Sequence, residues 1–576
     1  MSVGTAAVER VYAEFDDGTN RGLPDGPGRP DEPFDATTAM VLTWHAVPTD
    51  DQSADATVRY RRLTPTSGDW TTETGDWRPF WHREERIYRA ELRGLRPDAI
   101  YELEVSTAAP RVHLHTMPAS LTDRSVTIAT AADLQQGGFD GVAGRLTDRL
   151  AATHPDLFVG GGDYVSENGQ PTAGAAARWA AYLDGLYGLP DGRFLLEKTV
   201  DGARYPRVIV PHVTVIGNHE IGRENHLRWP SCVATSSAEP GYPTYIPAQW
   251  LELLFHWPFR SEGWQSELSA DHPNADPATH AGFGHGGFGK LSFGDYLLLV
   301  VLDNNQNWET VPDPELRDWE GNRIVDRWPW FGTHHGAVRQ DHWLRTLLEP
   351  EDGRSAAERY THVLPFWHRG LFCTGRPNAT IKNREILSAW LPPLVRAGVR
   401  LVNEAHEHNY ARTVPIGIDE GQPDDARIER VSFEPNTWPV PLVPDEYHRE
   451  YYTVECLLED DDIVGWCHDE VTATHDPSGL IAAGHGGWGA GRRPIGGRGA
   501  GQAGWWFVDE SNGGLAIDGE TSYHVRTITL DPATITVAEY LADGSGRVPA
   551  DPTFRYRTDP AGGPWERETA QGWSGY

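Results

Sequence analysis

The stretch HVTVIGNHE, residues 212–220, joins a strand pattern to a group of polar side chains. Its valines and isoleucine are β-branched, and it contains no Asp, Glu, Lys or Arg before its glycine. This composition is typical of a strand that is covered on both faces. The strand pattern ends on Asn218, His219 and Glu220. Side chains that bind metals or transfer protons are therefore predicted at a strand end.

Other apolar runs of the chain, two before this stretch and two after it, also end on Asp or His. They are SVTIATAAD, ending on Asp133; DLFVGGGD, on Asp163; THVLPFWH, on His368; and VRLVNEAHEH, on His406 and His408. Each run is weak by itself, because an Asp after a strand is usually a turn residue and a buried histidine is usually only hydrogen bonded. Sites assemble at the carboxyl ends of the strands in open α/β sheets, so the five runs in order predict one site.

The side chains at these strand ends are ligands for a borderline divalent or trivalent metal. They offer carboxylate and amide oxygens and imidazole nitrogens, with no thiolate among them. The four cysteines of the chain form no Cys-x-x-Cys pair, so a zinc ribbon is disfavoured.

The ordered set resembles the motifs of the calcineurin-like metallophosphoesterase superfamily, over about residues 125–545. Further segments resemble its purple acid phosphatase branch. These are GDYLLLVVLD (294–303), the Gln340-x-x-Trp343-Leu344 helix start, AHEHNYAR (405–412), AAGHGG (482–487) and YHVRTITL (523–530). The resemblance implies hydrolysis of phosphate esters, with metal-bound water or hydroxide as the nucleophile. Whether the substrate is a monoester or a diester stays open.

The resemblance also implies a role for each residue. Asp163 would bridge two metal ions, which would be iron, manganese or zinc. Asp133 and His408 would complete the first site, and Asn218, His368 and His406 the second. His219 would lie beside the substrate phosphate, without binding metal, as the candidate catalytic proton donor.

Two positions depart from the family pattern. Many members have Asp-x-His at the first motif, where this chain has Gln135 in place of the histidine. Purple acid phosphatases place a metal-binding tyrosine three residues after the bridging aspartate, where this chain has Ser166. Gln135, Tyr164 or additional water remain candidates for the missing ligand.

Two arginines after the fourth motif are candidates for binding the phosphate. Arg369 and Arg376 lie in the segment HRGLFCTGRPN, and planar guanidinium groups suit phosphate oxygens. Surface ion pairs are the commoner use of such arginines, so both assignments stay open.

The predicted fold has two parts. The first is an N-terminal antiparallel β-sandwich, which resembles a fibronectin type III domain. It is carried by alternating strands such as AMVLTWHA and by the spacing Leu95-x-Pro97-x-x-x-Tyr101, in which the tyrosine would pin a strand corner. The second part is an α/β domain, with two mixed β-sheets packed face to face and flanked by helices. Helices are predicted at Val142–Ala152, Ala175–Leu186, His342–Leu348 and Arg384–Arg396.

The predicted boundaries follow changes in composition. Residues 1–35 form an irregular lead-in, residues 36–120 the sandwich and residues 121–545 the catalytic domain. Long loop-like insertions are expected near 221–290 and 415–520, and residues 546–576 form a C-terminal tail.

The chain has 576 residues and a formal net charge of −33. Such a surface repels nucleic acid and anionic membranes, so neither partner is predicted, and a small phosphorylated substrate is. The N-terminus has no basic and no apolar region typical of a signal peptide. A cytoplasmic location is expected, or secretion if a leader has been removed. Oligomeric state is not predicted.

Two alternatives to the enzyme hypothesis differ in class. A degenerate family member would bind metal or phosphate ligands without turnover, but it would have no reason to keep His219. An adhesive or carbohydrate-binding protein would use the fibronectin-like part. That hypothesis leaves the metal-ligand pattern of the longer domain unexplained.

Salt is expected to stabilise this chain. Its positive charge comes almost entirely from arginine, since Lys198, Lys290 and Lys382 are its lysines. Acidic excess with scarce lysine fits either a protein adapted to concentrated salt or a high-GC genome that replaces lysine codons. If the first holds, screening of self-repulsion will raise the thermal unfolding midpoint as salt increases. A midpoint that falls or stays flat would favour the codon explanation.

Overall fold

In the part of the chain that the computed structural model describes, the strands form four β-sheets. The structure describes residues 7–15, 35–48, 57–80, 82–106, 109–135, 138–166, 173–221, 251, 254–255, 288–302, 304, 344–345, 347–349, 354–370, 390–420, 427–432, 453–459, 462–468, 471–492, 518–520 and 522–575. None of the helices described there is long and apolar enough to cross a membrane.

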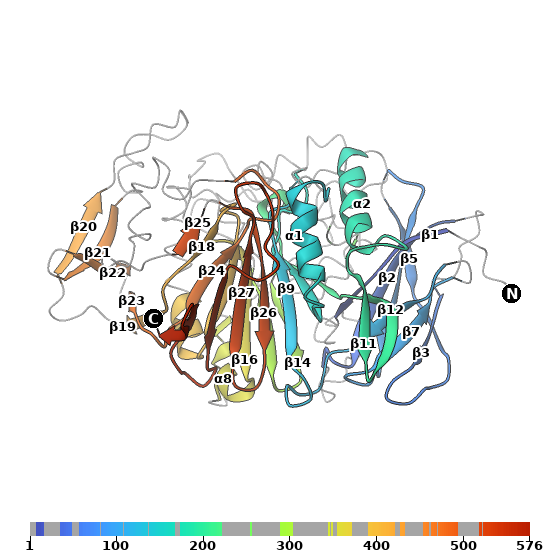
Figure 1. Ribbon diagram of the computed structural model, residues 1–576, viewed down its shortest axis with the longest axis horizontal. Helices are drawn as coiled ribbons and strands as arrows, with labels where there is room; N and C mark the ends of the chain where they lie inside the picture. Colours follow the sequence, from blue (N-terminus) through green and yellow to red (C-terminus); the bar gives the residue numbers. More distant parts are fainter. Residues whose placement is uncertain are drawn as a thin grey trace, which may run out of the picture.

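The largest sheet has 12 strands and runs through the middle of the molecule (Figure 1). Its order is β30 (Gly572–Gly575), β29 (Glu566–Thr569), β28 (Phe554–Thr558), β27 (Ile535–Leu541), β26 (His524–Leu530), β9 (Val126–Ala131), β10 (Leu157–Gly160), β13 (His212–Thr214), β1 (Ala7–Phe15), β2 (Ala39–Val47), β6 (Arg86–Arg93) and β5 (Asp76–Pro79). Strands β9, β10 and β13 are parallel neighbours. Their carboxyl ends therefore lie at one edge of the sheet.

A second mixed sheet has seven strands. Its order is β14 (Gly289–Phe293), β15 (Leu297–Val301), β16 (His362–Arg369), β17 (Leu401–Ala405), β24 (Ile481–His485), β18 (Tyr410–Arg412) and β25 (Asp518–Glu520). Strands β15, β16, β17 and β24 are parallel. Nearly all of their residues are buried, as expected for parallel strands that are covered on both faces.

The two mixed sheets contact each other. Ile128 and Phe158 of the first sheet belong to the same continuous hydrophobic core as Phe366 and Leu401 of the second. The buried Arg526 guanidinium of β26 donates to the carbonyl of Ala483 in β24 at 2.9 Å. The prediction of a mixed α/β fold with more than one sheet is confirmed.

Short helices flank the sheets. The structure has α1 (Val142–Ala151), α2 (Ala173–Tyr187), α3 (Asn218–Ile221) and α8 (Ala356–Arg359). Helix α1 buries Ala143, Leu146 and Leu150 on one face, the spacing of an amphipathic helix. The predictions for α1 and α2 are confirmed. Within the other two predicted helices, the structure describes helical backbone at residues 344–345, 347–348 and 390–396.

The sequence predicted a separate sandwich that ends at residue 120. The N-terminal strands do not form such a separate unit. Strands β2, β6 and β5 continue the 12-stranded sheet. The other strands of this part lie in a six-stranded sheet with order β11 (Leu195–Val200), β12 (Ala203–Ile209), β8 (Val112–His115), β7 (Ile100–Glu104), β3 (Thr57–Arg62) and β4 (Thr71–Thr74). Because β8 pairs with β12, one sheet spans the predicted boundary. The strand corner itself is confirmed, since the Tyr101 hydroxyl accepts the backbone N–H of Arg96 at 2.7 Å.

The prediction of an irregular lead-in over residues 1–35 is wrong for residues 7–15. This segment is strand β1, which pairs along its length with β2 and touches β13 through the pair Glu14 and His212. Its apolar residues Val11, Tyr12 and Ala13 are fully buried. The sequence does not show the alternating pattern of a half-buried strand here, because this strand is covered on both faces. Its apolar residues are interrupted by Arg10 and Glu14, which are also buried.

Two further boundary predictions are wrong. The predicted tail contains β28, β29 and β30, which extend the large sheet. The predicted insertion near 415–520 contains β24 and a five-stranded sheet. The order of that sheet is β19 (Ile416–Glu420), β23 (Val471–His475), β22 (Asp462–His468), β21 (Thr453–Glu459) and β20 (Arg427–Ser432). The strands of this five-stranded sheet pair antiparallel with one another. The insertion near 221–290 lies mostly outside the described residues.

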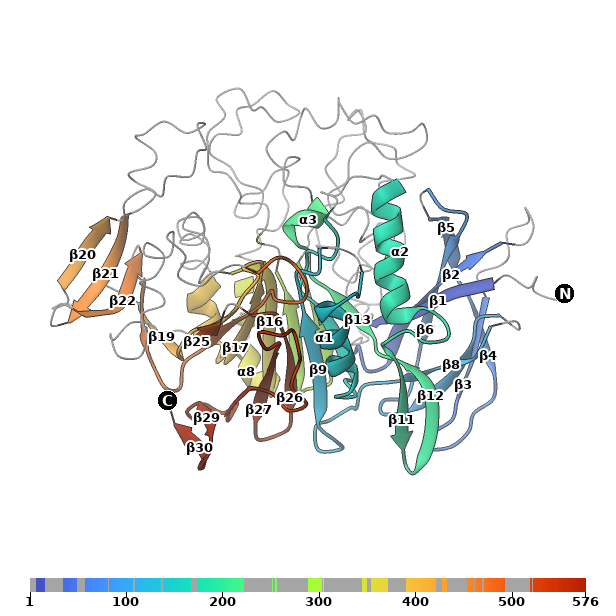
Figure 2. The same cartoon turned by 45° about the horizontal axis from the view of Figure 1, so that its top comes forward.

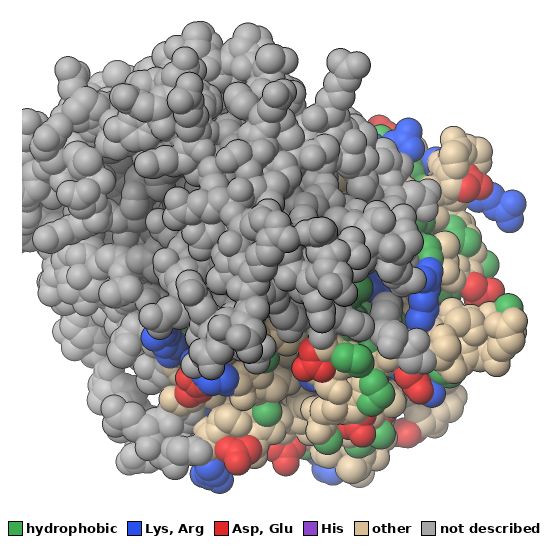
Figure 3. All heavy atoms as spheres, turned by 90° about the vertical axis from the view of Figure 1, so that its left-hand side faces the viewer, with side chains coloured by type: hydrophobic (Ala, Val, Ile, Leu, Met, Phe, Trp, Pro, Cys, Tyr) green, Lys and Arg blue, Asp and Glu red, His purple; other side chains and the backbone are tan. Residues whose placement is uncertain are grey.

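In the described part of the face drawn in Figure 3, acidic and basic side chains are interspersed, and scattered hydrophobic side chains lie between them.

Candidate metal centre

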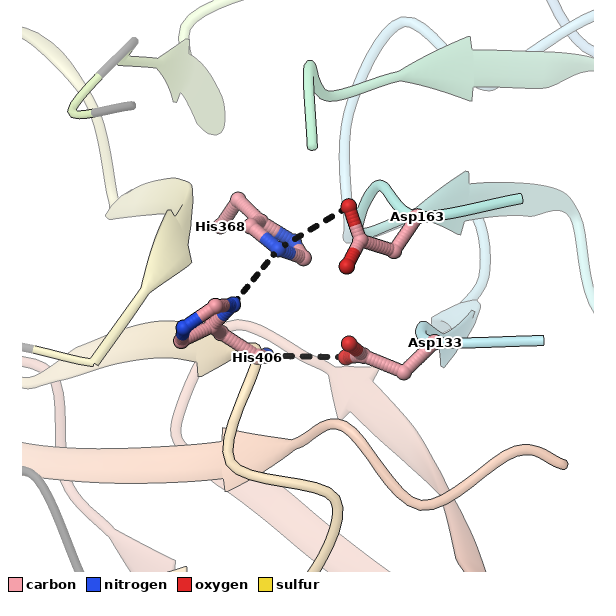
Figure 4. Close-up of side chains that lie close together, drawn as sticks. All are labelled: Asp133, Asp163, His368 and His406. Carbon is pink, nitrogen blue, oxygen red and sulfur yellow. Dashed lines mark hydrogen bonds and ion pairs between the residues drawn. The ribbon is translucent and has the colours of Figure 1, made fainter. Parts of the chain in front are cut away.

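Four side chains from four different strands meet at the carboxyl edge of the two mixed sheets. Asp133 follows β9, Asp163 follows β10, His368 belongs to β16 and His406 follows β17. One ligand atom of each lies within 4.8 Å of those of the others, and all four are buried. Figure 4 shows the two carboxylates facing the two imidazoles. Figure 2 shows α3, which begins with Asn218, at the same end as the carboxyl end of β9.

The backbone at these strand ends adopts the left-handed region. φ is +63° at Asp133, +56° at Asp163, +70° at His406 and +52° at His408. Residues other than glycine rarely adopt such angles, and they cluster where a site requires them. These positions lie within three residues after the ends of β9, β10 and β17.

One half of the cluster surrounds the Nε2 atom of His368. The Nδ1–H of this ring donates to the carbonyl of Gly161 at 2.8 Å, so Nε2 faces the cluster. Nε2 lies 3.2 Å from Asn218 Oδ1, 3.2 Å from His406 Nδ1 and 3.3 Å from Asp163 Oδ1. Burial lowers the pKa of His368, but the neighbouring Asp163 carboxylate outweighs it and raises that pKa to about 9. This half of the cluster therefore attracts a positive charge.

The other half surrounds the Nε2 atom of His408. Its Nδ1–H donates to the carbonyl of Gly491 at 2.9 Å. Nε2 lies 3.1 Å from Asp133 Oδ1 and 3.0 Å from Gln135 Nε2. The Gln135 amide also donates to Asp163 Oδ2 at 3.3 Å. Gln135, predicted as a candidate ligand, is therefore placed at the cluster.

The donor atoms of this cluster fit a cation. Asp133 Oδ2 accepts the backbone N–H of His406 at 2.8 Å, while Oδ1 is buried with no hydrogen-bond donor among the described residues. Buried carboxylate oxygens are normally satisfied. A buried oxygen that faces His408 Nε2 has the arrangement expected of a metal ligand.

His219 lies at the edge of the cluster and outside the group of four. Its backbone N–H donates to Asp163 Oδ1 at 2.8 Å, and its Nε2 lies 3.7 Å from Asp163 Oδ2. Its side chain is 22% exposed, whereas those of Asp163 and His368 are 1% and 0% exposed. Its ring is therefore the one of these three that solvent reaches.

Glu220 is a site residue that the sequence prediction left without a role. Its buried carboxylate accepts the backbone N–H groups of Asp163 and Gly217 at 2.8 Å and of Tyr164 at 2.9 Å. Burial and the nearby Asp163 charge raise the pKa of Glu220 to about 8. The glutamate clamps the β10 turn onto the start of α3. Its position at the end of the GNHE motif was the feature of the sequence that could have indicated a role at the site.

No protein-family model and no curated protein sequence matches this chain. Solved structures do. A purple acid phosphatase, PPD1, from yellow lupin (Lupinus luteus) seeds matches over 96% of this chain and 74% of its own, with a TM-score of 0.51 and 11% identity. A structure of PhoD matches over 97% of this chain and 91% of its own, with a TM-score of 0.51 and 12% identity.

The chain has the calcineurin-like metallophosphoesterase fold. Its similarity to the purple acid phosphatase extends over nearly the whole chain, which includes the N-terminal strands. Within this metallophosphoesterase fold, the buried cluster of two aspartates and two histidines occupies the strand ends where the sequence motifs predicted a site.

The prediction of Tyr164 as an additional metal ligand is wrong. In this metallophosphoesterase fold its hydroxyl donates to the carbonyl of Gly160 at 2.6 Å. The ring packs against the rings of Trp179 and Tyr182 of α2. Burial raises the pKa of Tyr164 well above its usual value. The Tyr164 hydroxyl is therefore hydrogen bonded inside the core, to the carbonyls of Gly160 and Val215.

Protein loaded with ferric iron is expected to show no purple colour. The position that carries the colour-giving tyrosine in purple acid phosphatases is Ser166, and Tyr164 points into the core. The visible spectrum of iron-loaded protein checks this. An intense band that disappears in Tyr164→Phe would contradict the placement of the Tyr164 hydroxyl.

Of the two arginines predicted to bind phosphate, the structure describes Arg369 but not Arg376. Arg369 directly follows His368, and its peptide N–H and carbonyl both bond to the Asn304 side chain, at 2.9 and 2.6 Å. Asn304 thereby fixes the end of β16, a role the sequence did not indicate. Phosphate binding by Arg369 stays a prediction. Arg376 lies outside the described residues.

Proposed function

We propose that this protein hydrolyses phosphate esters with a dinuclear metal centre. The observation that carries the proposal is the position of Asp163. One of its carboxylate oxygens lies 3.3 Å from His368 Nε2, and the other lies 3.3 Å from Gln135 Nε2, which also contacts His408. The carboxylate thus faces both halves of the cluster. A shared carboxylate is the arrangement that a two-metal site requires.

The proposed ligands follow the two halves. Asp133, His408 and Gln135 would hold the first ion, and Asn218, His368 and His406 the second, with Asp163 shared. Gln135 can present its amide oxygen after a rotation that exchanges its two terminal atoms. The described residues of the cluster offer oxygen and nitrogen ligands without a thiolate, which favours iron, manganese or zinc. Such ions, when bound, activate water for attack on phosphorus and neutralise phosphoryl oxygens.

The protein's own residues orient these groups. The carbonyls of Gly161 and Gly491 hold the His368 and His408 rings through their Nδ1–H groups, which directs both Nε2 lone pairs inward. Glu220 accepts the backbone N–H of Asp163 at 2.8 Å, which holds the segment that carries the shared carboxylate. These contacts preorganise the site before any ligand binds.

His219 is proposed as the group that protonates the leaving oxygen. Its backbone is held by Asp163, while its ring is partly exposed at the cluster edge. Nε2 is the atom closest to the cluster and would hold the transferred proton. A positioned side chain of this kind contributes on the order of 10²–10⁴-fold to the rate.

The N-terminal strands are proposed to be a fibronectin type III-like accessory built into the enzyme. The Tyr101 corner supports this assignment. The shared sheets indicate that this part stabilises the catalytic part rather than moving as a separate module.

The test is metal analysis combined with a substrate panel. Metal-free protein would be reloaded separately with iron, manganese or zinc and assayed with phosphomonoesters, phosphodiesters and nucleotides. The proposal predicts two ions per chain and metal-dependent release of product from at least one class. Two bound ions without hydrolysis of any substrate would instead support the degenerate, ligand-binding alternative.

A further inference from the structure

A recess opens beside the His408 half of the cluster. It has a volume of about 370 Å³, and the described residues that line it are Gln135, Ser166, Arg178, Ala490 and Gly491. Two of these belong to the site already described, because Gln135 contacts His408 Nε2 and the Gly491 carbonyl holds His408 Nδ1. The recess therefore adjoins the His408 half of the proposed metal centre.

Backbone hydrogen bonds hold two of the segments that line the recess. The Ser166 N–H donates to the Gln135 carbonyl at 2.7 Å, and the Ala490 N–H donates to the Asp133 carbonyl at 2.8 Å. The segments that carry Ser166 and Ala490 are thus tied to the residues at the metal centre. A volume of this size is at the low end of small-ligand pockets.

Arg178 carries the only charge among the described residues that line the recess. It lies on α2, next to Trp179, whose ring packs 5.7 Å from the ring of Tyr164. Tyr182, one turn further on, also packs against Tyr164, at 5.3 Å. Because Tyr164 directly follows Asp163, these contacts hold α2 against the segment that carries the shared carboxylate. Figure 2 shows α2 standing beside α3 at this end of the sheet.

We propose that Arg178 is a specificity-determining residue that binds a second anionic group of the substrate. The preferred substrate would be a compact phosphate ester that carries a further carboxylate or phosphate. The scissile phosphate would lie at the metal centre and the second anion in the recess. A guanidinium binds such groups through paired, charge-assisted hydrogen bonds. This inference rests on the proposed function and names its substrate class.

The direct test is binding, which needs no turnover. Metal-loaded protein would be titrated calorimetrically with 4-carboxybenzylphosphonate, with its neutral carboxylate methyl ester, and with benzylphosphonate. The rigid ring separates the two acids, so a single ion cannot chelate both. Wild type should bind the carboxylate at least about tenfold more tightly than the ester, as expected for a hydrogen-bonded charge pair.

Arg178→Gln should remove this preference and leave binding of benzylphosphonate unchanged. Arg178→Lys should keep part of it, because lysine retains the charge but not the planar fork. Arg204→Gln is the matched control, since that arginine is 71% exposed in an ion pair with Glu197. An unchanged preference in Arg178→Gln, or none in wild type, would overturn the inference.

Hydrolysis of the corresponding phenyl phosphates separates this inference from the proposed function. If neither these esters nor any member of the wider substrate panel is hydrolysed while the Arg178-dependent preference remains, the proposed function fails and the anion subsite stands. If both are hydrolysed equally well and Arg178→Gln changes neither binding nor kcat/KM, the subsite fails and the proposed function stands.

Discussion

Asp163→Ala is expected to lower bound metal well below one ion per chain and to reduce hydrolysis by at least about 10³-fold, because ion-assisted phosphoryl transfer gains several kcal/mol from the metals. The reason is that this one carboxylate faces both halves of the cluster. Both ions should therefore be lost together rather than one at a time. Metal analysis of the purified, reloaded variant measures this directly.

Two controls make the Asp163 result interpretable. Asp163→Asn keeps the shape of the side chain but removes its charge, so it should lose metal while the thermal unfolding midpoint changes less than in the alanine variant. Asp148→Ala removes an aspartate that is 62% exposed on α1 and should retain full metal content. Full metal content in Asp163→Ala would rule out the shared-carboxylate role.

His219→Ala is expected to keep both metals and to lose about 10²–10⁴-fold in kcat, the range of general acid catalysis. Its ring lies at the exposed edge of the cluster, and its backbone N–H, which alanine retains, is what contacts Asp163 Oδ1. The loss should be smaller for nitrophenyl phosphate than for an alkyl phosphate, because nitrophenolate leaves without protonation.

The dependence on the leaving group separates two roles of His219. An equal loss for good and poor leaving groups would exclude proton donation and favour stabilisation of phosphate charge. Unchanged turnover with every substrate would show that His219 lies outside the chemistry altogether.

The candidate site was predictable from the sequence because its residues follow apolar strands. Runs such as DLFVGGGD and THVLPFWH carry both the strand pattern and the ligand that ends it. Asp163 and His368 follow or end strands of two different sheets, and the packing of these sheets brings them to 3.3 Å of each other. The side-chain direction of Tyr164 was not predictable, because it depends on the left-handed backbone at Asp163, which reverses the alternation expected for an extended chain.

The boundaries were predicted less well for a different physical reason. Strands β1 and β28 are recognisable only by their neighbours, since each contains charged residues that the fold pairs or covers. Arg10 in β1 is 1% exposed, yet its guanidinium forms ion pairs with Glu85 and Asp184. In the sequence, a strand that contains such charged residues cannot be told apart from a solvent-exposed loop. The role of Glu220 is hidden likewise, because its partners are backbone N–H groups.

Anomalous diffraction from crystals of manganese- or zinc-loaded protein tests the dinuclear centre most directly. The account predicts two separate peaks, one beside Asp133 and His408 and one beside His368 and His406, with the Asp163 carboxylate between them. No peak at these residues, or a single peak that Asp163 does not contact, would contradict it.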